Sequence, residues 1–189
     1  MKEIVFRSSN PRHFFMPTPL PDIERVESVK LLGVIFKYNL KFNDHVTAIL
    51  SQCSQRLYLL KLLKKQGLCE IKINIIYNSL VVSRLSYALP AWASFVSAAL
   101  VDMINSFFKR SHRYNLCSKN YNFIELLSSA DKKLFNKIQN PDHCLYFCLP
   151  PLKDNNHGLR KKGHNFQLPN YELELTKRSF VTRCLYKFK

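Results

Sequence analysis

Acidic residues are scarce in this sequence, and their scarcity determines its charge. Only 13 of the 189 residues are Asp or Glu, against 29 Lys and Arg, which gives a formal net charge of +16 at pH 7. A surface of this kind attracts polyanions. Nucleic acid is the commonest polyanionic partner, because each phosphate neutralised by Lys or Arg releases a condensed counterion. An anionic membrane surface is the alternative.

Long hydrophobic runs are also missing. The first ten residues contain no apolar stretch long enough for a signal peptide, and no run of about 18 apolar residues occurs anywhere in the chain. We therefore expect an intracellular protein, nuclear or cytoplasmic, that does not enter a membrane. The six cysteines are scattered and are predicted to be reduced and mostly to pack as small core residues.

The sequence lacks the usual catalytic motifs. It contains no G-x-S-x-G, no Walker loop and no G-x-G-x-x-G, and no Ser or Cys has a neighbouring base with an orienting partner. Two-metal phosphoryl transfer needs converging carboxylates. The one close acidic group, Asp22, Glu24 and Glu27, lies in a proline-rich segment that is typical of a solvated loop. We expect no enzyme activity from the chain alone, no catalytic residue and no cofactor.

A zinc site is the main alternative chemistry. Thiolate and imidazole are the ligands that zinc prefers, and Cys144, Cys148, His157 and His164 make up a Cys2His2 set. The spacing of the histidines, with six residues between them, does not suit such a site, and His143 does not improve it. The other interpretation is a buried cysteine pair on a short helix, with no metal.

The pattern predicts a mainly α fold with a small N-terminal β-hairpin (α+β). Residues 3–8 and 29–38 suit strands, with Gly33 as a point of close backbone approach and four prolines between the strands. A helix over 43–67 would be capped by Asn43 or Asp44 and stopped by Gly67. Its apolar stripe comprises Val46, Ile49, Leu50, Cys53, Leu57 and Leu60. Leu59, Leu62 and Leu63 lie opposite, so we expect the helix to be sandwiched between two surfaces.

The rest of the chain suggests further helices. Residues 70–87 are apolar nearly all round, which predicts a central buried helix ended by Pro90. Residues 98–116 place Leu100, Met103, Ile104, Phe107 and Ser111 on one face, with a polar back. Short helices fit 122–127 and 130–138, and a mostly irregular basic segment ends in a helix over 175–188. The predicted parts are a hairpin over 1–40, a helical domain over 41–119, short helices over 120–152 and a basic arm over 153–189.

Basic clusters give the best functional signal. Lys109, Arg110 and Arg113 lie away from the apolar stripe of their helix and suit a phosphate backbone, although a solvated face is the alternative. Cations in the last turn of a helix also interact favourably with the negative end of its macrodipole, which is a second explanation for Lys61, Lys64 and Lys65. The basic arm contributes Arg160, Lys161, Lys162, Lys177 and Arg178.

The order of several segments resembles that in non-LTR (LINE-type) retrotransposon reverse transcriptases. The matching segments are K-E-I-V-F at 2–6, V-K-L-L-G-V-I-F at 29–36, F-N-D-H-V at 42–46, Q-R-L-Y-L-L-K at 55–61, I-Y-N-S-L-V-V-S-R-L-S-Y-A-L-P-A-W at 76–92, K-R-S-H-R at 109–113, L-F at 134–135, N-P-D-H at 140–143, L-R-K-K-G-H-N-F-Q-L-P at 159–169 and K-R-S-F-V-T-R at 177–183. The resemblance covers nearly the whole chain and depends on order and spacing rather than on one diagnostic motif.

The resemblance implies the part of such a polymerase that follows the catalytic Tyr-x-Asp-Asp motif, which this sequence lacks. Residues 4–6 would resemble the last palm strand, Leu31, Leu32 and Gly33 the primer grip, and 43–118 the thumb, which clamps the RNA/DNA template and primer duplex. An intact enzyme would use Mg²⁺ in the missing palm, and the palm and fingers polypeptide is an implied partner. A start at Met1 would suit a reading frame within a truncated element. The alternative is a domesticated or vestigial helical protein-interaction module without nucleic-acid function.

Overall fold

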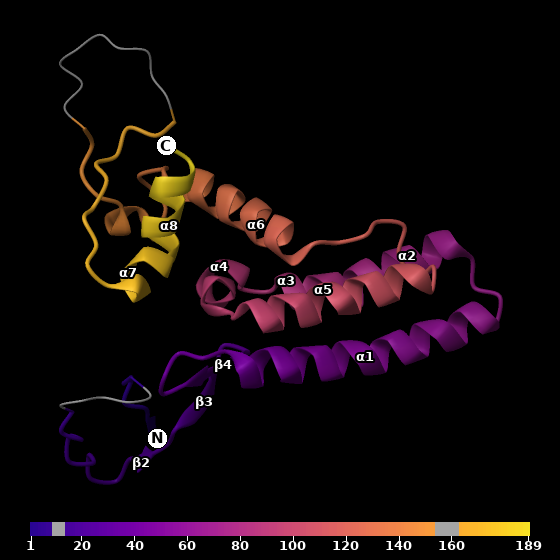
Figure 1. Ribbon diagram of the computed structural model, residues 1–189, viewed down its shortest axis with the longest axis horizontal. Coiled ribbons are helices and arrows are strands. Elements are labelled where there is room, and N and C mark those ends of the chain that lie inside the picture. The colour runs from indigo at the N-terminus through magenta and orange to yellow at the C-terminus, as the bar shows by residue number, and fades with distance from the viewer. Residues whose placement is uncertain (9–13, 154–162) are drawn as a thin grey trace. The chain divides into compact units, whose positions relative to one another are not determined.

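The computed structural model describes residues 1–8, 14–153 and 163–189. Two compact units are present, each of which is described by itself. The first unit comprises Met1–Leu85 and Phe95–Asn120, and the second comprises Ser86–Ser94 and Tyr121–Lys189. The fold is mainly helical with short strands near the N-terminus, as predicted (Figure 1).

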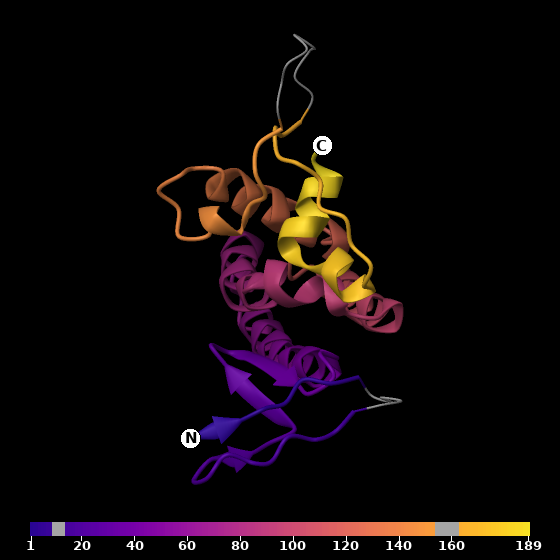
Figure 2. The ribbon, with the colours of Figure 1, turned by 90° about the vertical axis from the view of Figure 1, so that its left-hand side faces the viewer.

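The N-terminal part of the first unit contains two small β-sheets (Figure 2). Strands β1 (Lys2–Glu3) and β2 (Glu24–Arg25) pair in parallel, and β3 (Ser28–Leu31) and β4 (Val34–Lys37) form an antiparallel hairpin. A small N-terminal hairpin is confirmed, but the single strand predicted over 29–38 is wrong, because the chain turns at Leu32 and Gly33 and this segment forms both strands of the hairpin. The prediction of a strand over 3–8 is wrong, because pairing ends at Glu3, and the apolar residues that follow it run on without a strand partner among the described residues.

The hairpin turn has an unusual residue at its tip. Leu31 pairs with Val34, which leaves Leu32 and Gly33 as a two-residue loop with φ values of 46° and 85°. Positive φ at both positions is the geometry of a type I′ turn, for which Asn-Gly is the preferred pair. A bulky Leu in this conformation is strained, and the Leu32 side chain is 82% exposed.

Leu32→Asn should therefore stabilise the protein. Asn adopts the left-handed conformation at lower cost than Leu, so we expect the free energy of unfolding to rise by about 1 kcal/mol. Chemical denaturation followed by circular dichroism measures this change. An unchanged or lower stability would show that the Leu32 side chain stabilises the hairpin by more than its backbone strain costs.

Helix α1 (Asn43–Lys65) is the longest element of the first unit. The predicted stripe is confirmed, since all six of its residues are buried. The predicted cap is wrong: Phe42 occupies the N-cap position, with no side-chain hydrogen bond there. The expected second covering surface is also absent from the described part of the chain, where Leu59, Leu62 and Leu63 are 57%, 39% and 36% exposed.

The helix predicted over 70–87 is a composite. Helix α2 (Glu70–Tyr77) continues into a π-helical turn, η1 (Asn78–Val82), and then into α3 (Ser83–Ser86). Its buried stripe consists of Ile73, Tyr77, Val81 and Leu85. Residues four apart drift around a regular α-helix, and the wider π turn offsets this drift. The prediction of burial all round is wrong, because Ile71 and Ile75 are exposed.

Helix α5 (Ala98–Arg113) runs beside α1 and in the same direction (Figure 1). Four of its five predicted core residues are buried, but Met103 is exposed and Phe108 is buried in its place. At the other end of this core, Phe42 contacts Phe36 of β4 and Phe95, with ring centroids 5.7 and 6.0 Å apart. These aromatic contacts attach the hairpin to the helices.

Helices α1 and α5 end with the same motif. In α1, the Leu68 and Gly67 N–H groups donate to the carbonyls of Leu63 and Lys64, each at 3.1 Å. In α5, the Leu116 N–H donates to Ser111 at 3.2 Å and the Asn115 N–H to His112 at 2.8 Å. Both are Schellman motifs, with Gly67 and Asn115 in the left-handed conformation that the motif requires. The predicted stop at Gly67 is confirmed, and the helix predicted to reach residue 116 ends at Arg113.

The second unit is built around α6 (Phe123–Ile138) and α8 (Phe180–Lys187). Shorter elements complete it: α4 (Leu89–Trp92), the first two residues of the 3₁₀ turn η2 (Ala93–Phe95), the 3₁₀ turn η3 (Tyr146–Cys148), and α7 (Glu174–Arg178). Pro90 stands in the first turn of α4 rather than at the end of the preceding helix. Trp92 is buried there, where its indole N–H donates to the Tyr87 carbonyl at 3.0 Å.

One continuous helix replaces the two short helices predicted over 122–138. Asn122 caps it by accepting hydrogen bonds from the N–H groups of Ile124 and Glu125 at 2.9 and 3.3 Å. The described part of the segment after 153 is not an isolated arm. Phe166, Cys184 and Leu185 form a core with Phe135 and Ile138 of α6, and helices α7 and α8 replace the single predicted terminal helix.

His45 makes the stability of the first unit dependent on pH. It is buried, and its Nδ1 accepts a hydrogen bond from the Ile35 N–H at 3.3 Å. Burial, with smaller contributions from Arg84 and Lys30, lowers the pKa of His45 to about 4. In the unfolded chain this pKa is about 6.5. The unfolded state therefore binds more protons between these values, and protonation favours unfolding.

We expect the free energy of unfolding to fall by about 2 to 3 kcal/mol through His45 as the pH drops from 6.5 to 4. Denaturation curves at several pH values would measure this change. The control is His45→Asn, which should flatten the dependence in this window. An equally steep dependence in the variant would assign the effect to other groups.

Across the described residues, no helix is both long enough and apolar enough to cross a membrane.

Candidate nucleic-acid interface

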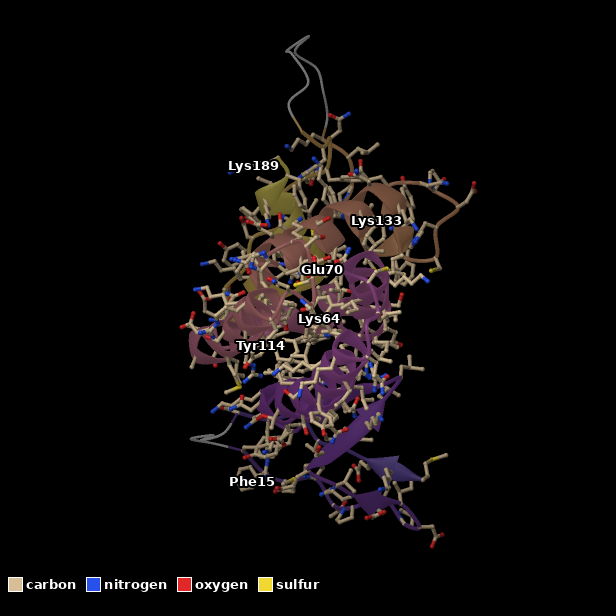
Figure 3. The ribbon with its side chains drawn as sticks, turned by 90° about the vertical axis from the view of Figure 1, so that its right-hand side faces the viewer. Phe15, Lys64, Glu70, Tyr114, Lys133 and Lys189 are labelled. Carbon is tan, nitrogen blue, oxygen red and sulfur yellow. The ribbon has the colours of Figure 1, made fainter. Side chains whose placement is uncertain are left out.

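The basic turns of α1 and α5 come together at one end of the first unit. The Lys61 ammonium lies 3.3 Å from the centroid of the Tyr114 ring, directly after α5. Lys64 donates to the carbonyls of Tyr114 and Asn115 at 3.4 and 3.2 Å. These contacts join residues about fifty positions apart in the sequence (Figure 3). We call this region, with Lys61, Lys64 and Lys65 of α1 and Lys109, Arg110 and Arg113 of α5, the basic end.

Lys64 serves the fold of the basic end. Besides the two carbonyls, its ammonium contacts the Glu70 carboxylate at 3.1 Å, so a single cation joins the ends of α1 and α5 and the start of α2. The macrodipole explanation for this residue thus applies in a modified form. Lys64 lies in the last turn of its own helix, and it also donates hydrogen bonds to two carbonyls that follow α5.

The other cations of the basic end face outward. Lys65, Lys109, Arg110 and Arg113 are exposed, and Lys61 is half-buried against Tyr114. Lys109 and Arg113 are four residues apart on one helix face, and the Arg110 guanidinium carbon lies 5.6 Å from the centroid of the Phe107 ring. Arginine and lysine presented from the ends of two packed helices can contact successive phosphates.

The remaining predicted residues lie elsewhere. Leu31, Leu32 and Gly33 form the tip of the β3–β4 hairpin, with both leucines exposed. In the second unit, Lys177 pairs with Glu174 at 3.6 Å, and Arg178 is exposed. Arg160, Lys161 and Lys162 lie outside the described residues. The basic end therefore includes six of the predicted cations.

The histidine that the zinc alternative needs is engaged by the protein. The His164 Nδ1 accepts from the Phe166 N–H at 3.2 Å, so its Nε2 carries the proton and donates to the Leu185 carbonyl at 2.7 Å. His157 lies outside the described residues. Cys144 and Cys148 are exposed, which corrects the expectation of a buried cysteine pair.

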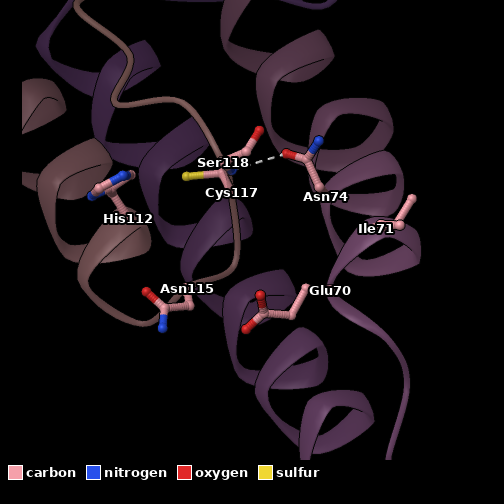
Figure 4. A pocket seen from close by; sticks show the side chains of 7 residues that line it. All are labelled: Glu70, Ile71, Asn74, His112, Asn115, Cys117 and Ser118. Atoms are coloured by element: carbon pink, nitrogen blue, oxygen red, sulfur yellow. Dashed lines mark hydrogen bonds between the residues drawn. The ribbon is translucent and has the colours of Figure 1, made fainter.

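A pocket of about 610 Å³ adjoins the basic end (Figure 4). The start of α2, the last turn of α5 and the segment that follows α5 line it, with Glu70, Ile71, Asn74, His112, Asn115, Cys117 and Ser118 as its lining residues. The Asn74 Oδ1 accepts from the Ser118 N–H at 3.2 Å, which ties the two walls together. Burial raises the pKa of the Cys117 thiol, which disfavours the nucleophilic thiolate.

No pattern in the sequence predicts this pocket. Its polar residues come from three separate segments, and no spacing rule connects Asn74 to Ser118 before the helices are packed. The left-handed Asn115 at the end of α5 could have been suspected from the basic last turn before it, because Asn is a common alternative to Gly after a helix.

Comparisons with protein-family models, with curated protein sequences and with solved structures found no match to this chain.

Proposed function

We propose that this chain is a nucleic-acid-gripping module that corresponds to the thumb and C-terminal part of a non-LTR reverse transcriptase. It would hold an RNA/DNA duplex through its phosphates and would not polymerise alone. The observation that carries the proposal is the basic end, where contacts of Lys61 and Lys64 with Tyr114 join the ends of α1 and α5, and where Lys65, Lys109, Arg110 and Arg113 are exposed. The order of sequence segments that resembles this family, and the net charge of +16, support it.

Phosphate contacts explain this arrangement better than base readout does. Helix ends that present Lys and Arg from two directions can follow a backbone, but they insert no element into a groove. Sequence preference should therefore be low. The palm and fingers that would hold the catalytic Mg²⁺ would come from another polypeptide or from sequence outside this chain.

A protein-binding module is the second candidate, and one observation favours it. Tyr58, Leu59, Leu62 and Leu63 form an exposed, mostly apolar face on α1, opposite the buried stripe. Such faces are characteristic of protein interaction sites. In this case the chain would be a domesticated helical module, and the face of α1, rather than the basic end, would carry its function.

Duplex binding as a function of salt tests the first candidate. We expect the affinity of the purified chain for an RNA/DNA duplex to fall at least tenfold between 50 and 200 mM salt, because each contacted phosphate releases a counterion. Filter binding measures this response. The matched control is Leu59→Ser with Leu62→Ser, which alters the α1 face and should leave duplex affinity unchanged. A flat salt response, or no binding, would reject the phosphate-gripping function.

A further inference from the structure

We propose that the pocket beside the basic end is a binding site for a single unpaired nucleobase. This inference deepens the proposed function, since it places a base-recognition site next to a phosphate-binding surface. The pocket volume of about 610 Å³ lies within the range of about 300 to 1,000 Å³ that is usual for small-ligand sites.

The pocket offers hydrogen-bonding groups that suit the edge of a base. Among the described residues, His112, Asn115 and Ser118 have no side-chain hydrogen bond to another protein group. The Asn74 Oδ1 accepts from the Ser118 N–H at 3.2 Å and from the Asn78 amide nitrogen at 3.5 Å, so this oxygen is engaged within the protein. Carboxamides provide a donor and an acceptor side by side, the arrangement with which proteins pair to base edges.

The walls of the pocket favour a neutral, flat ligand. Ile71 of α2 is 75% exposed, and Cys117 after α5 is a buried, protonated thiol, so each wall contributes an apolar group to the lining. The Glu70 carboxylate disfavours an anion inside the pocket, because its partner Lys64, at 3.1 Å, is not among the lining residues and no Lys or Arg is. A phosphate is therefore a poor occupant, whereas an uncharged base meets both polar edges and apolar faces.

Exposed cations are next in sequence to several lining residues of the pocket. Each of three lining residues is followed directly by an exposed basic residue: Lys72 follows Ile71, Arg113 follows His112, and Lys119 follows Ser118. Because these cations are exposed and next to residues that line the pocket, they are available to a phosphate attached to a base inside it. A nucleotide could then place its base in the pocket and its phosphate against these cations.

Two sources could supply this base: an unpaired nucleotide that continues one strand of a duplex, or a free nucleotide. The test uses three RNA/DNA duplexes, one blunt, one with a single adenosine overhang and one with an abasic overhang of equal charge. Fluorescence anisotropy measures their affinities for the full chain. Adenosine monophosphate alone is the fourth probe.

We expect the adenosine overhang to raise affinity about tenfold over the blunt duplex, the usual size of a hydrogen-bonded base contact, and the abasic overhang to raise it less than twofold. Asn115→Gly keeps the left-handed backbone and removes the side chain, and His112→Ala is an independent second variant. Each should reduce the gain to below threefold and leave blunt-duplex affinity unchanged. Asn136→Ala, an exposed residue of α6, is the control and should retain the full gain.

The outcomes separate this inference from the proposed function. Adenosine monophosphate binding that both variants abolish, without any overhang gain, would assign the pocket to a free nucleotide. Equal affinity for the adenosine and abasic overhangs, together with no binding of the monophosphate, would overturn the inference that the pocket binds a base, even if the blunt duplex binds. If no duplex binds, the proposed function fails. Binding of adenosine monophosphate to the wild type and the two variants then tests by itself whether the pocket binds a base.

Discussion

Replacing Lys109, Arg110 and Arg113 with Glu should weaken binding of an RNA/DNA duplex by about 100-fold at 100 mM salt. The three side chains are exposed at the end of α5, beside the basic turn of α1. Each lost phosphate contact should also make the salt dependence shallower by about one unit of slope, and each added carboxylate repels the duplex. Isothermal titration calorimetry at several salt concentrations measures both the affinity and its salt dependence.

A matched control separates position from total charge. Lys132, Lys133 and Lys137 are exposed on α6 of the second unit, and their replacement with Glu changes the net charge by the same amount. The α6 variant should lose less than fivefold in affinity. Equal losses in both variants would mean that the chain attracts nucleic acid through its overall charge and has no localised interface.

Carboxylates at positions 110 and 113, in the last turn of α5, also interact unfavourably with the helix macrodipole, at a cost of about 0.3 to 1 kcal/mol each. A second variant with Gln at the same three positions avoids most of this cost. Its thermal unfolding should match that of the wild type, while its affinity falls by about 10-fold. Loss of binding in the Glu variant alone would point to damage of the helix end rather than to lost phosphate contacts.

The second large effect concerns the ion pair inside the second unit. Asp131 is fully buried on α6, and Arg183 of α8 donates to both of its carboxylate oxygens at 2.8 and 2.9 Å. The same guanidinium donates to the carbonyls of Pro90 and Arg178, at 3.1 and 2.6 Å. One side chain thus connects α4, α6 and α7 to α8.

Asp131→Ala should destabilise the second unit by about 3 to 5 kcal/mol, because Arg183 keeps its charge in a largely buried position without its partner. Hydrogen exchange of the α6 and α8 amides should show the loss. The double variant Asp131→Ala with Arg183→Met should recover part of it. As a control, Glu174→Ala breaks an exposed pair with Lys177 and should cost less than about 1 kcal/mol. A loss no larger in Asp131→Ala than in Glu174→Ala would contradict the role of the buried pair.

Periodicity predicted the helices of the first unit well where one face is buried. The α1 stripe and the stop at Gly67 were predictable because they depend on local spacing and on one residue type. The exposure of Leu59 and Ile71 was not, because an apolar residue predicts burial whether or not the fold provides a surface to cover it. The π turn that keeps Tyr77 and Val81 on one face has no local sequence signal.

The candidate site was predictable only in part. Clustering along the sequence indicated the two basic turns, but the contacts of Lys61 and Lys64 with residues after α5 depend on the parallel packing of two helices. The second unit was harder. Arg183 and Asp131 are 52 residues apart in the sequence. An arginine is usually expected at the surface, but the Arg183 side chain is largely buried against the Asp131 carboxylate.

Cross-linking of a bound duplex tests the central claim most directly. A photoreactive RNA/DNA duplex is bound to the intact chain at 50 mM salt, irradiated and digested, and the cross-linked peptides are identified by mass spectrometry. We predict that cross-links concentrate on the ends of α1 and α5, around Lys61 to Lys65 and Lys109 to Arg113. Cross-links that fall mainly on α6, or spread evenly over the lysines of both units, would contradict a duplex-gripping function at the basic end.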